Sequence, residues 1–115
     1  MDVGDELRAC FGDYESEEKS QAWLDTKSSL QVGSLVSGKV VARRQFGVFV
    51  DIGLDFPALI LVVKLRNADK TPYTSMEMYP AIGDTVEARV YAFADHNRQI
   101  GLSQLDDEPM LDAQS

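Results

Sequence analysis

Aromatic and basic residues lie at positions of this sequence where they could bind a flat, negatively charged ligand. The stretch "RRQFGVFVDIG" carries Arg43, Phe46 and Phe49, and a later stretch places Tyr91 two residues after Arg89. Aromatic rings stack on the bases of single-stranded nucleic acid whatever their identity, while Lys and Arg contact its phosphates. The residue types therefore favour stacking and ion pairing as the chemistry of this chain.

The sequence has few of the side chains that catalysis or metal binding requires. His96 is the only histidine and Cys10 the only cysteine, so no known motif assembles a nucleophile and its base or a cysteine and histidine metal site. His96 stands in "DHNR", whose composition is typical of a tight turn, and no glycine-rich phosphate loop occurs. We therefore expect no enzyme, no metal, no cofactor and no small-molecule substrate.

The elements that must position the aromatic rings are predicted to be β-strands. Apolar residues alternate with polar ones in "VSGKVVA", "VFVDI", "VEARVYA" and "QIGLS", and such alternation is typical of strands with one buried face. "PALILVVKL" is a continuous apolar run opened by Pro57, which indicates a buried strand. Five short strands within about seventy residues favour a small closed barrel. The longest break, residues 66–84, has room for one helical turn at "SMEMY".

Strand parity gives a direction to the two phenylalanines of the second strand. Successive side chains point to opposite sides of a strand, so Phe49 faces outward if Val48 and Val50 face the core. By simple parity Phe46 would point inward. Gly47 permits a bend, and this bend is expected to turn the Phe46 ring to the surface.

The same count applies to the first and fourth strands. It places Val40 and Ala42 on one face of the first strand, and Tyr91 and Phe93 on the solvent side of the fourth. Outward aromatic rings have a second interpretation, in which a loop, the preceding helix or a partner protein covers them. The pattern alone leaves both interpretations open.

The residues on either side of the barrel are predicted to be acidic. Residues 1–15 show no sustained apolar period and are predicted to be a flexible acidic arm. Residues 16–32 are predicted to form a short helix and linker, with Ser16 as its cap and Trp23 as the residue that anchors it by packing or through a partner. Residues 105–115 are predicted to be a flexible acidic tail.

The formal net charge of −8 is concentrated in these flanking segments. Residues 1–32 carry eight acids and three bases, residues 104–115 carry four acids and no base, and residues 33–103 carry seven acids and eight bases. The acidic segments have two interpretations. They either give solubility alone, or bind through their charge to a basic face of the barrel or to a basic partner.

Location follows from the start of the chain and its hydropathy. Acids stand at the N-terminus where a secretory signal would carry basic residues and an apolar run, and no stretch is apolar for long enough to span a membrane. A single cysteine fits a reducing compartment. We expect a cytoplasmic monomer without membrane contact.

The segments quoted above, with "AIGDTVEARV" and "DHNRQIGLSQ", closely resemble the S1 RNA-binding domain over residues 33–104. The motif residues at family spacing are Gly38, Phe46, Gly47, Phe49, Val50, Gly83, Asp84, Ile100, Leu102 and Ser103. The resemblance implies an all-β fold, a five-stranded antiparallel barrel of the OB type, preceded by a short helix.

The resemblance also implies an RNA site, which this chain keeps in part. Its RNA-contacting positions fall on Phe46, Phe49, Leu61, Asp95 and Gln99. Leu61 replaces the family's histidine and Val63 a serine, while Gln99 replaces a basic residue for which Arg98 is the nearest substitute. Arg43 adds a positive charge at a position that is usually aliphatic.

Two functional hypotheses follow. The first is an RNA-binding module in translation or RNA processing that holds single-stranded RNA with low sequence specificity. Its stacking residues are Phe46, Phe49 and Tyr91, its phosphate contacts are Lys39, Arg43, Arg89 and Arg98, and Asp95 and Gln99 complete the site. Three or four phosphate contacts predict a slope of about −2 to −3 for log affinity against log salt.

The second hypothesis is an OB-type protein-interaction module that has weakened or lost RNA binding. Its partner would be the ribosome or an RNA-processing protein. Leu61 and Val63, which make the third strand more apolar, motivate this alternative.

Overall fold

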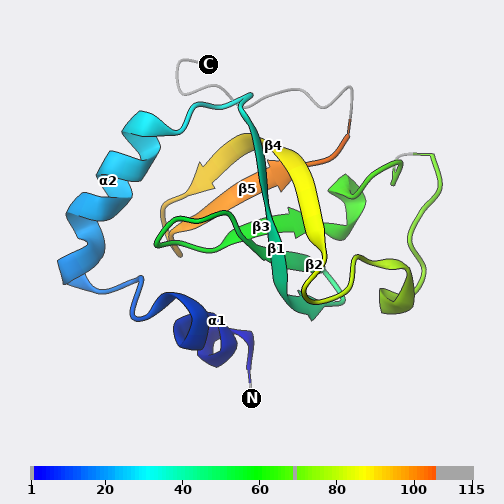
Figure 1. Ribbon diagram of the computed structural model, residues 1–115, viewed down its shortest axis with the longest axis horizontal. Coiled ribbons are helices and arrows are strands. Elements are labelled where there is room, and N and C mark those ends of the chain that lie inside the picture. Colours follow the sequence, from blue (N-terminus) through cyan, green and yellow to red (C-terminus); the bar gives the residue numbers. More distant parts are fainter. Residues whose placement is uncertain (1, 69, 106–115) are drawn as a thin grey trace.

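A computed structural model describes residues 2–68 and 70–105 of the chain and shows two helices beside a strand barrel (Figure 1). The helices and strands are α1 (Val3–Phe11), α2 (Ser20–Ser29), β1 (Leu35–Arg44), β2 (Gly47–Asp51), β3 (Ala58–Leu61), β4 (Thr85–Ala94) and β5 (Gln99–Ser103). Single 3₁₀ turns occupy Glu17–Lys19, Val62–Lys64 and Met76–Met78. The acidic tail predicted for residues 105–115 lies, apart from Leu105, outside the described residues.

The five strands of the described chain close into one barrel in the order β1-β2-β3-β5-β4. This confirms the predicted all-β, five-stranded barrel of the OB type. The prediction that all its pairs are antiparallel is wrong at one pair, because β3 and β5 run parallel, with Ala58 opposite Ile100. β4 lies between β3 and β5 in the sequence. It carries the chain back to the end of the barrel where β3 begins, so β5 starts at the same end as β3. No helix among the described residues is long and apolar enough to cross a membrane.

The barrel interior holds the apolar residues that the alternation pointed inward. Val48, Val50, Ile60, Val90 and Ile100 are fully buried. β-branched side chains suit this interior because they pack well on a pleated strand. The predicted inward direction of Val48 and Val50 is therefore confirmed.

A bulge in β1 changes the face on which Ala42 lies. Val40 is paired with Val50, but the register shifts before the next pair, which joins Ala42 to Phe49. A bulge inserts one extra residue and so reverses the alternation beyond it. The prediction that Ala42 shares the face of Val40 is wrong, and Ala42 lies beside Phe49 on the outside of the barrel.

β4 contains a matching bulge between Val90 and Ala92. Beyond it Phe93 is paired with Ile100, whose side chain is buried in the barrel. The predicted solvent-facing position of Phe93 is therefore wrong. Its ring meets the Trp23 ring edge-to-face, with the centroids 5.9 Å apart.

Residues 3–11 form a helix where the sequence predicted an arm without regular structure. Asp2 caps α1 by accepting a hydrogen bond from the backbone N–H of Asp5 at 2.9 Å, and Gly12, with φ of 72°, ends it. Within α1, every residue of which the structure describes, Leu7 alone is buried. One buried residue gives no apolar period, so the sequence did not reveal this helix.

The predicted helix around Trp23 is confirmed as α2 and the 3₁₀ turn before it. Trp23 is 4% exposed, and its ring packs edge-to-face on Phe56 with the centroids 5.0 Å apart. Together with the Phe93 contact, this makes Trp23 a packing residue that covers one end of the barrel. α2 therefore gains its stability from docking, as a short helix must.

Candidate nucleic-acid interface

The surface to which the sequence assigned RNA stacking is the outside of β2, β3 and β5. In the strand register Phe49 lies opposite Leu59, and Leu59 lies opposite Gly101. All three alternate with buried residues on their own strands, so they point away from the interior. We call this surface, formed by Phe49, Leu59, Gly101 and their neighbours, the outer face.

Phe46 and Phe49 differ sharply in access. Phe46 is 45% exposed, whereas Phe49 is 1% exposed. The two rings meet edge-to-face with the centroids 5.8 Å apart. The predicted surface position of Phe46 is confirmed. Phe49 faces outward as parity required, but it is covered, so its ring is not accessible to a base in this structure.

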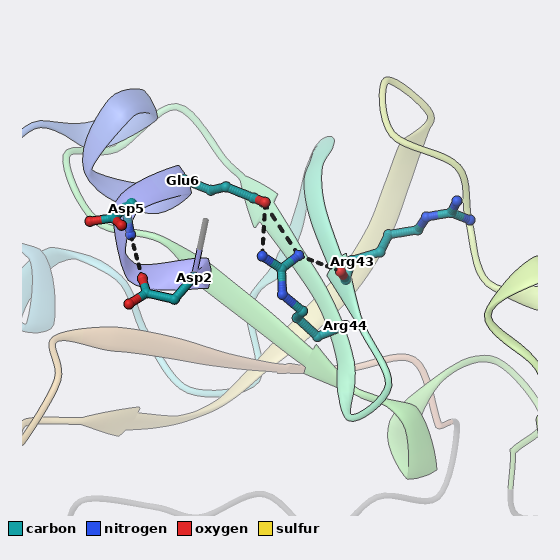
Figure 2. Close-up of polar contacts among 5 residues, drawn as sticks. All are labelled: Asp2, Asp5, Glu6, Arg43 and Arg44. Carbon is teal, nitrogen blue, oxygen red and sulfur yellow. Dashed lines mark hydrogen bonds and ion pairs between the residues drawn. The ribbon is translucent and has the colours of Figure 1, made fainter.

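α1 lies on the side of the barrel to which Phe49 points. Arg44 of β1 is two residues from Ala42, the partner of Phe49, and lies on the same side of the strand. Its guanidinium reaches the Glu6 carboxylate of α1 at 2.8 Å (Figure 2). Leu7, the next residue of α1, is buried in the same apolar cluster as Phe49. α1 therefore lies on the outside of the β1–β2 pair.

An apolar groove lies on the outer face, and one of its residues, Leu61, is opposite Gly47, the neighbour of Phe46. Its volume is about 120 Å³, and it is lined by Leu59, Leu61, Tyr91, Ala92, Phe93, Ala94, Gln99 and Gly101. Leu61, at the position of the family's histidine, makes this groove apolar. The side chains that line it offer few hydrogen bonds to a base edge.

Tyr91 lines the groove and is less exposed than the sequence predicted. It occupies the β4 bulge and is half-buried, because its ring lies against Gly101, where an added Cβ would stand 2.9 Å from Tyr91 Cε1. The Lys64 ammonium stands over the ring, 4.4 Å from its centroid. This cation–π contact, worth about 0.5–1 kcal/mol at exposed sites, occupies the ring that was expected to stack on a base.

Lys64 is a basic residue of this surface that the sequence analysis missed. It ends the apolar run of the third strand, and the 3₁₀ turn Val62–Lys64 brings it over Tyr91. Burial lowers the pKa of Lys64 and raises the pKa of Tyr91. A lysine directly after an apolar strand is the signal that could have identified it.

Asp95, the predicted acidic residue of the site, contacts the N-terminal segment. Its carboxylate accepts hydrogen bonds from Trp23 Nε1 at 2.8 Å and Lys27 Nζ at 2.6 Å. The Lys27 and Trp23 hydrogen bonds lower the pKa of Asp95. This carboxylate therefore fastens α2 to the turn between β4 and β5.

Arg98 and Gln99 also hold the N-terminal segment. Arg98 donates to the carbonyl oxygens of Tyr14 and Ser16, at 3.3 and 2.7 Å, and to Ser20 Oγ at 3.0 Å. Gln99 hydrogen-bonds the Tyr14 side chain, although burial outweighs this bond and raises the pKa of Tyr14. The donors that were predicted to contact a phosphate are engaged within the protein.

The remaining predicted bases divide between two sides of the barrel. Arg43 points away from Arg44 (Figure 2) and donates to the carbonyl oxygen of Met76 at 3.1 Å, close in the chain to Phe46. Lys39 and Arg89 are exposed on the β1–β4 pair. This pair closes the barrel opposite β3, so the structure does not bring Lys39 and Arg89 together with Phe46.

The remaining candidates for chemistry stand apart from this surface. His96 is exposed in the turn between β4 and β5, and Cys10 is exposed on α1. Across residues 2–68 and 70–105, no three His, Cys, Asp or Glu side chains gather closely enough to hold a metal ion.

The sequence was compared with protein families and with known proteins. Residues 29–104 match the S1 RNA binding domain. The chain is 35% identical over 81 residues to the small ribosomal subunit protein bS1 of Chlamydia muridarum, a match that covers 70% of this chain and 14% of that protein. It is 37% identical over 83 residues to the transcriptional accessory protein Tex of Neisseria gonorrhoeae, covering 71% of this chain and 11% of that protein.

Solved structures agree on the fold. GSP13 of Bacillus subtilis superimposes with a TM-score of 0.54 at 23% identity, over 65% of this chain and 55% of that one. The shared part is the barrel fold. The chain thus spans only a small fraction of the curated relatives it matches and about half of this solved structure.

Proposed function

Because the chain belongs to the S1 RNA-binding domain family, we propose that it holds single-stranded RNA with low sequence specificity on the outer face of its barrel. The observation that carries this proposal is the exposed Phe46 ring together with an apolar groove whose residue Leu61 lies opposite Gly47, the neighbour of Phe46. Arg43 lies three residues before Phe46 and donates to the Met76 carbonyl oxygen, and Lys64 stands over Tyr91 at the groove. Lys64 therefore brings positive charge to the groove itself, and Arg43 is close to Phe46 in the chain.

The chemistry of the groove explains why specificity is low. A base that stacks on Phe46 presents its face, and every base has one, so stacking does not distinguish sequence. Readout of a base edge needs donors and acceptors, and Leu59, Leu61 and Gly101 present apolar surface there. Arg43 and Lys64 act on the phosphates, which carry no sequence information.

The names of two relatives support a proposal about the process. One is a ribosomal protein and another a transcriptional accessory protein. We propose a role in translation or RNA processing, with the RNA as the direct partner.

Replacing Phe46 by alanine tests the stacking surface. Loss of one stacked base costs about 1–3 kcal/mol, so we expect the dissociation constant for fluorescent oligo(U) to rise about 5- to 150-fold. Fluorescence anisotropy at low salt measures it. The matched control is Leu35→Ala, since Leu35 is also an exposed apolar residue but lies on the β1–β4 side. Equal affinities of Phe46→Ala and Leu35→Ala for oligo(U) would show that Phe46 does not contact the RNA.

The salt dependence of binding tests the phosphate contacts. We count two phosphate contacts, Lys64 at the groove and Arg43 close to Phe46 in the chain, so log affinity is expected to fall with log salt at a slope of about −1.4, at −0.7 per phosphate. This slope is shallower than the one predicted from sequence, because Lys39 and Arg89 lie elsewhere and Arg98 is engaged. Titrations between about 20 and 200 mM KCl span the range in which such a slope is measured. A slope near −3 would mean about four phosphate contacts, and Lys39 and Arg89 would then contact the RNA as well.

A second candidate function is protein interaction, favoured by the apolar character of the same surface. Val63 and Met76 are exposed near Phe46, and Phe49 is already covered by protein. Pull-down with the tagged chain from lysate, with and without nuclease, distinguishes the two functions. Retention of the same protein after nuclease treatment favours protein interaction, whereas loss of bound material favours RNA.

A further inference from the structure

The N-terminal segment, residues 2–29, contacts the same positions at which the family resemblance places RNA. α1 lies on the side of the barrel where Phe49 is buried. The link between the helices meets Gln99 and Arg98 through Tyr14 and Ser16. These contacts join residues more than 80 positions apart in the chain. RNA could not reach these positions while the segment is docked.

The chemistry of the segment resembles that of the ligand it would exclude. Residues 2–29 carry eight acids and three bases. The Glu6 carboxylate meets Arg44, and two backbone carbonyl oxygens meet Arg98, so negative charge and dipoles engage cations that a phosphate would otherwise contact. The buried Tyr14 ring and Leu7 side chain supply apolar contact.

The two ends of the segment are held with different strength. α2 has the buried Trp23 ring against two aromatic rings and two hydrogen bonds to Asp95. Among the described residues, α1 has one ion pair with the barrel, between partners about one-third exposed, one buried side chain, and two partly buried ones, Val3 and Phe11. A nine-residue helix is marginal by itself. α1 is therefore the part that can leave while α2 stays in place.

We propose that α1 is an autoinhibitory element that competes with RNA for the outer face. This inference rests on the proposed RNA binding. Detachment of α1 uncovers Phe49 beside the already exposed Phe46 and frees Arg44 for a phosphate. RNA and docked α1 exclude each other, so the apparent RNA affinity is the intrinsic affinity reduced by the fraction of molecules in which α1 is detached.

Two charge reversals on α1 in the full chain test the proposal. Glu6→Lys replaces the ion pair with Arg44 by repulsion, whereas Asp5→Lys makes the same change of charge at a residue whose carboxylate pairs with Arg8 of its own helix. Glu6→Lys is expected to bind oligo(U) about three- to ten-fold more tightly than Asp5→Lys. Its salt slope should be steeper by about 0.7, since Arg44 then contacts a phosphate.

Trypsin cleavage after Arg8 gives an independent measure of docking. Saturating oligo(U) should accelerate this cleavage several-fold in the unaltered chain, because bound RNA keeps α1 detached. Leu7→Ser, which removes the buried contact of α1, should raise both the cleavage rate and the RNA affinity. Circular dichroism of each variant shows that the barrel remains folded.

The outcomes separate this inference from the proposed function. If all chains bind RNA, and Glu6→Lys equals Asp5→Lys in affinity and slope, α1 does not compete and the inference is wrong. If Leu7→Ser is cleaved faster but binds RNA no better, the inference is equally wrong. If neither the unaltered chain nor any variant binds RNA, the proposed function fails, and the inference fails with it.

Discussion

Replacement of Gly38 by alanine is expected to lower the free energy of unfolding by about 3 kcal/mol, because β1 and β2 leave no space for a side chain there. A Cβ at this position would stand 2.2 Å from the Asp51 carbonyl oxygen and 2.9 Å from Val50 Cγ1. The nearest obstruction is backbone, which cannot rotate away as the end of a side chain can. β1 bends here from its pairing with β4 to its pairing with β2, since Lys39 is a partner of both strands.

Urea denaturation followed by Trp23 fluorescence measures this loss. Ser37→Ala is the matched control, because Ser37 is the exposed neighbour of Gly38 in the same strand and its change should stay within about 0.5 kcal/mol. The close strand approach also gives a physical reason for the glycine of the motif "SGKV". Equal midpoints for the two variants would show that β1 can shift to accommodate the methyl group.

The strands were predictable because one physical signal, burial of alternate side chains, acts within each strand. Val48 and Val50 face the interior as the pattern required. The same rule failed for Ala42 and Phe93, which follow bulges in β1 and β4. A bulge depends on how a strand must bend against its neighbours, and no residue of "VVARR" or "VYAFA" marks the extra position. Parity is therefore reliable only up to the first irregularity.

The candidate site was predictable where its residues share one hairpin and not where they meet across the fold. Phe46 and Gly47 are adjacent, so the exposure of the Phe46 ring followed from the local sequence. The helix on the side of Phe49 is bound through Arg44 to Glu6, thirty-eight residues earlier, and Tyr14 reaches Gln99 from a still greater separation. Such contacts leave no local pattern, and an acidic segment with one buried leucine gave no reason to expect a docked helix.

Replacement of Trp23 by alanine is expected to lower the free energy of unfolding by about 3–5 kcal/mol, the usual cost of removing a large buried aromatic side chain. Trp23 stands between Phe56 and Phe93 at the end of the barrel, so its loss leaves a cavity lined by both rings. Trp23→Phe should cost less, about 1–2 kcal/mol. It keeps much of the packing and loses the hydrogen bond to Asp95, which retains Lys27 as a partner.

Urea denaturation followed by circular dichroism measures both changes, since the fluorescent residue is absent from these variants. Leu24→Ala is the control, because Leu24 is the neighbouring apolar residue of α2 and is exposed. A large loss for Trp23→Ala alone means that α2 is part of the barrel and stays docked when α1 leaves. A loss no greater than that of Leu24→Ala would mean that α2 detaches as readily as α1. RNA would then compete with the whole of residues 2–29, and Asp95 and Arg98 would become available to it together with Arg44.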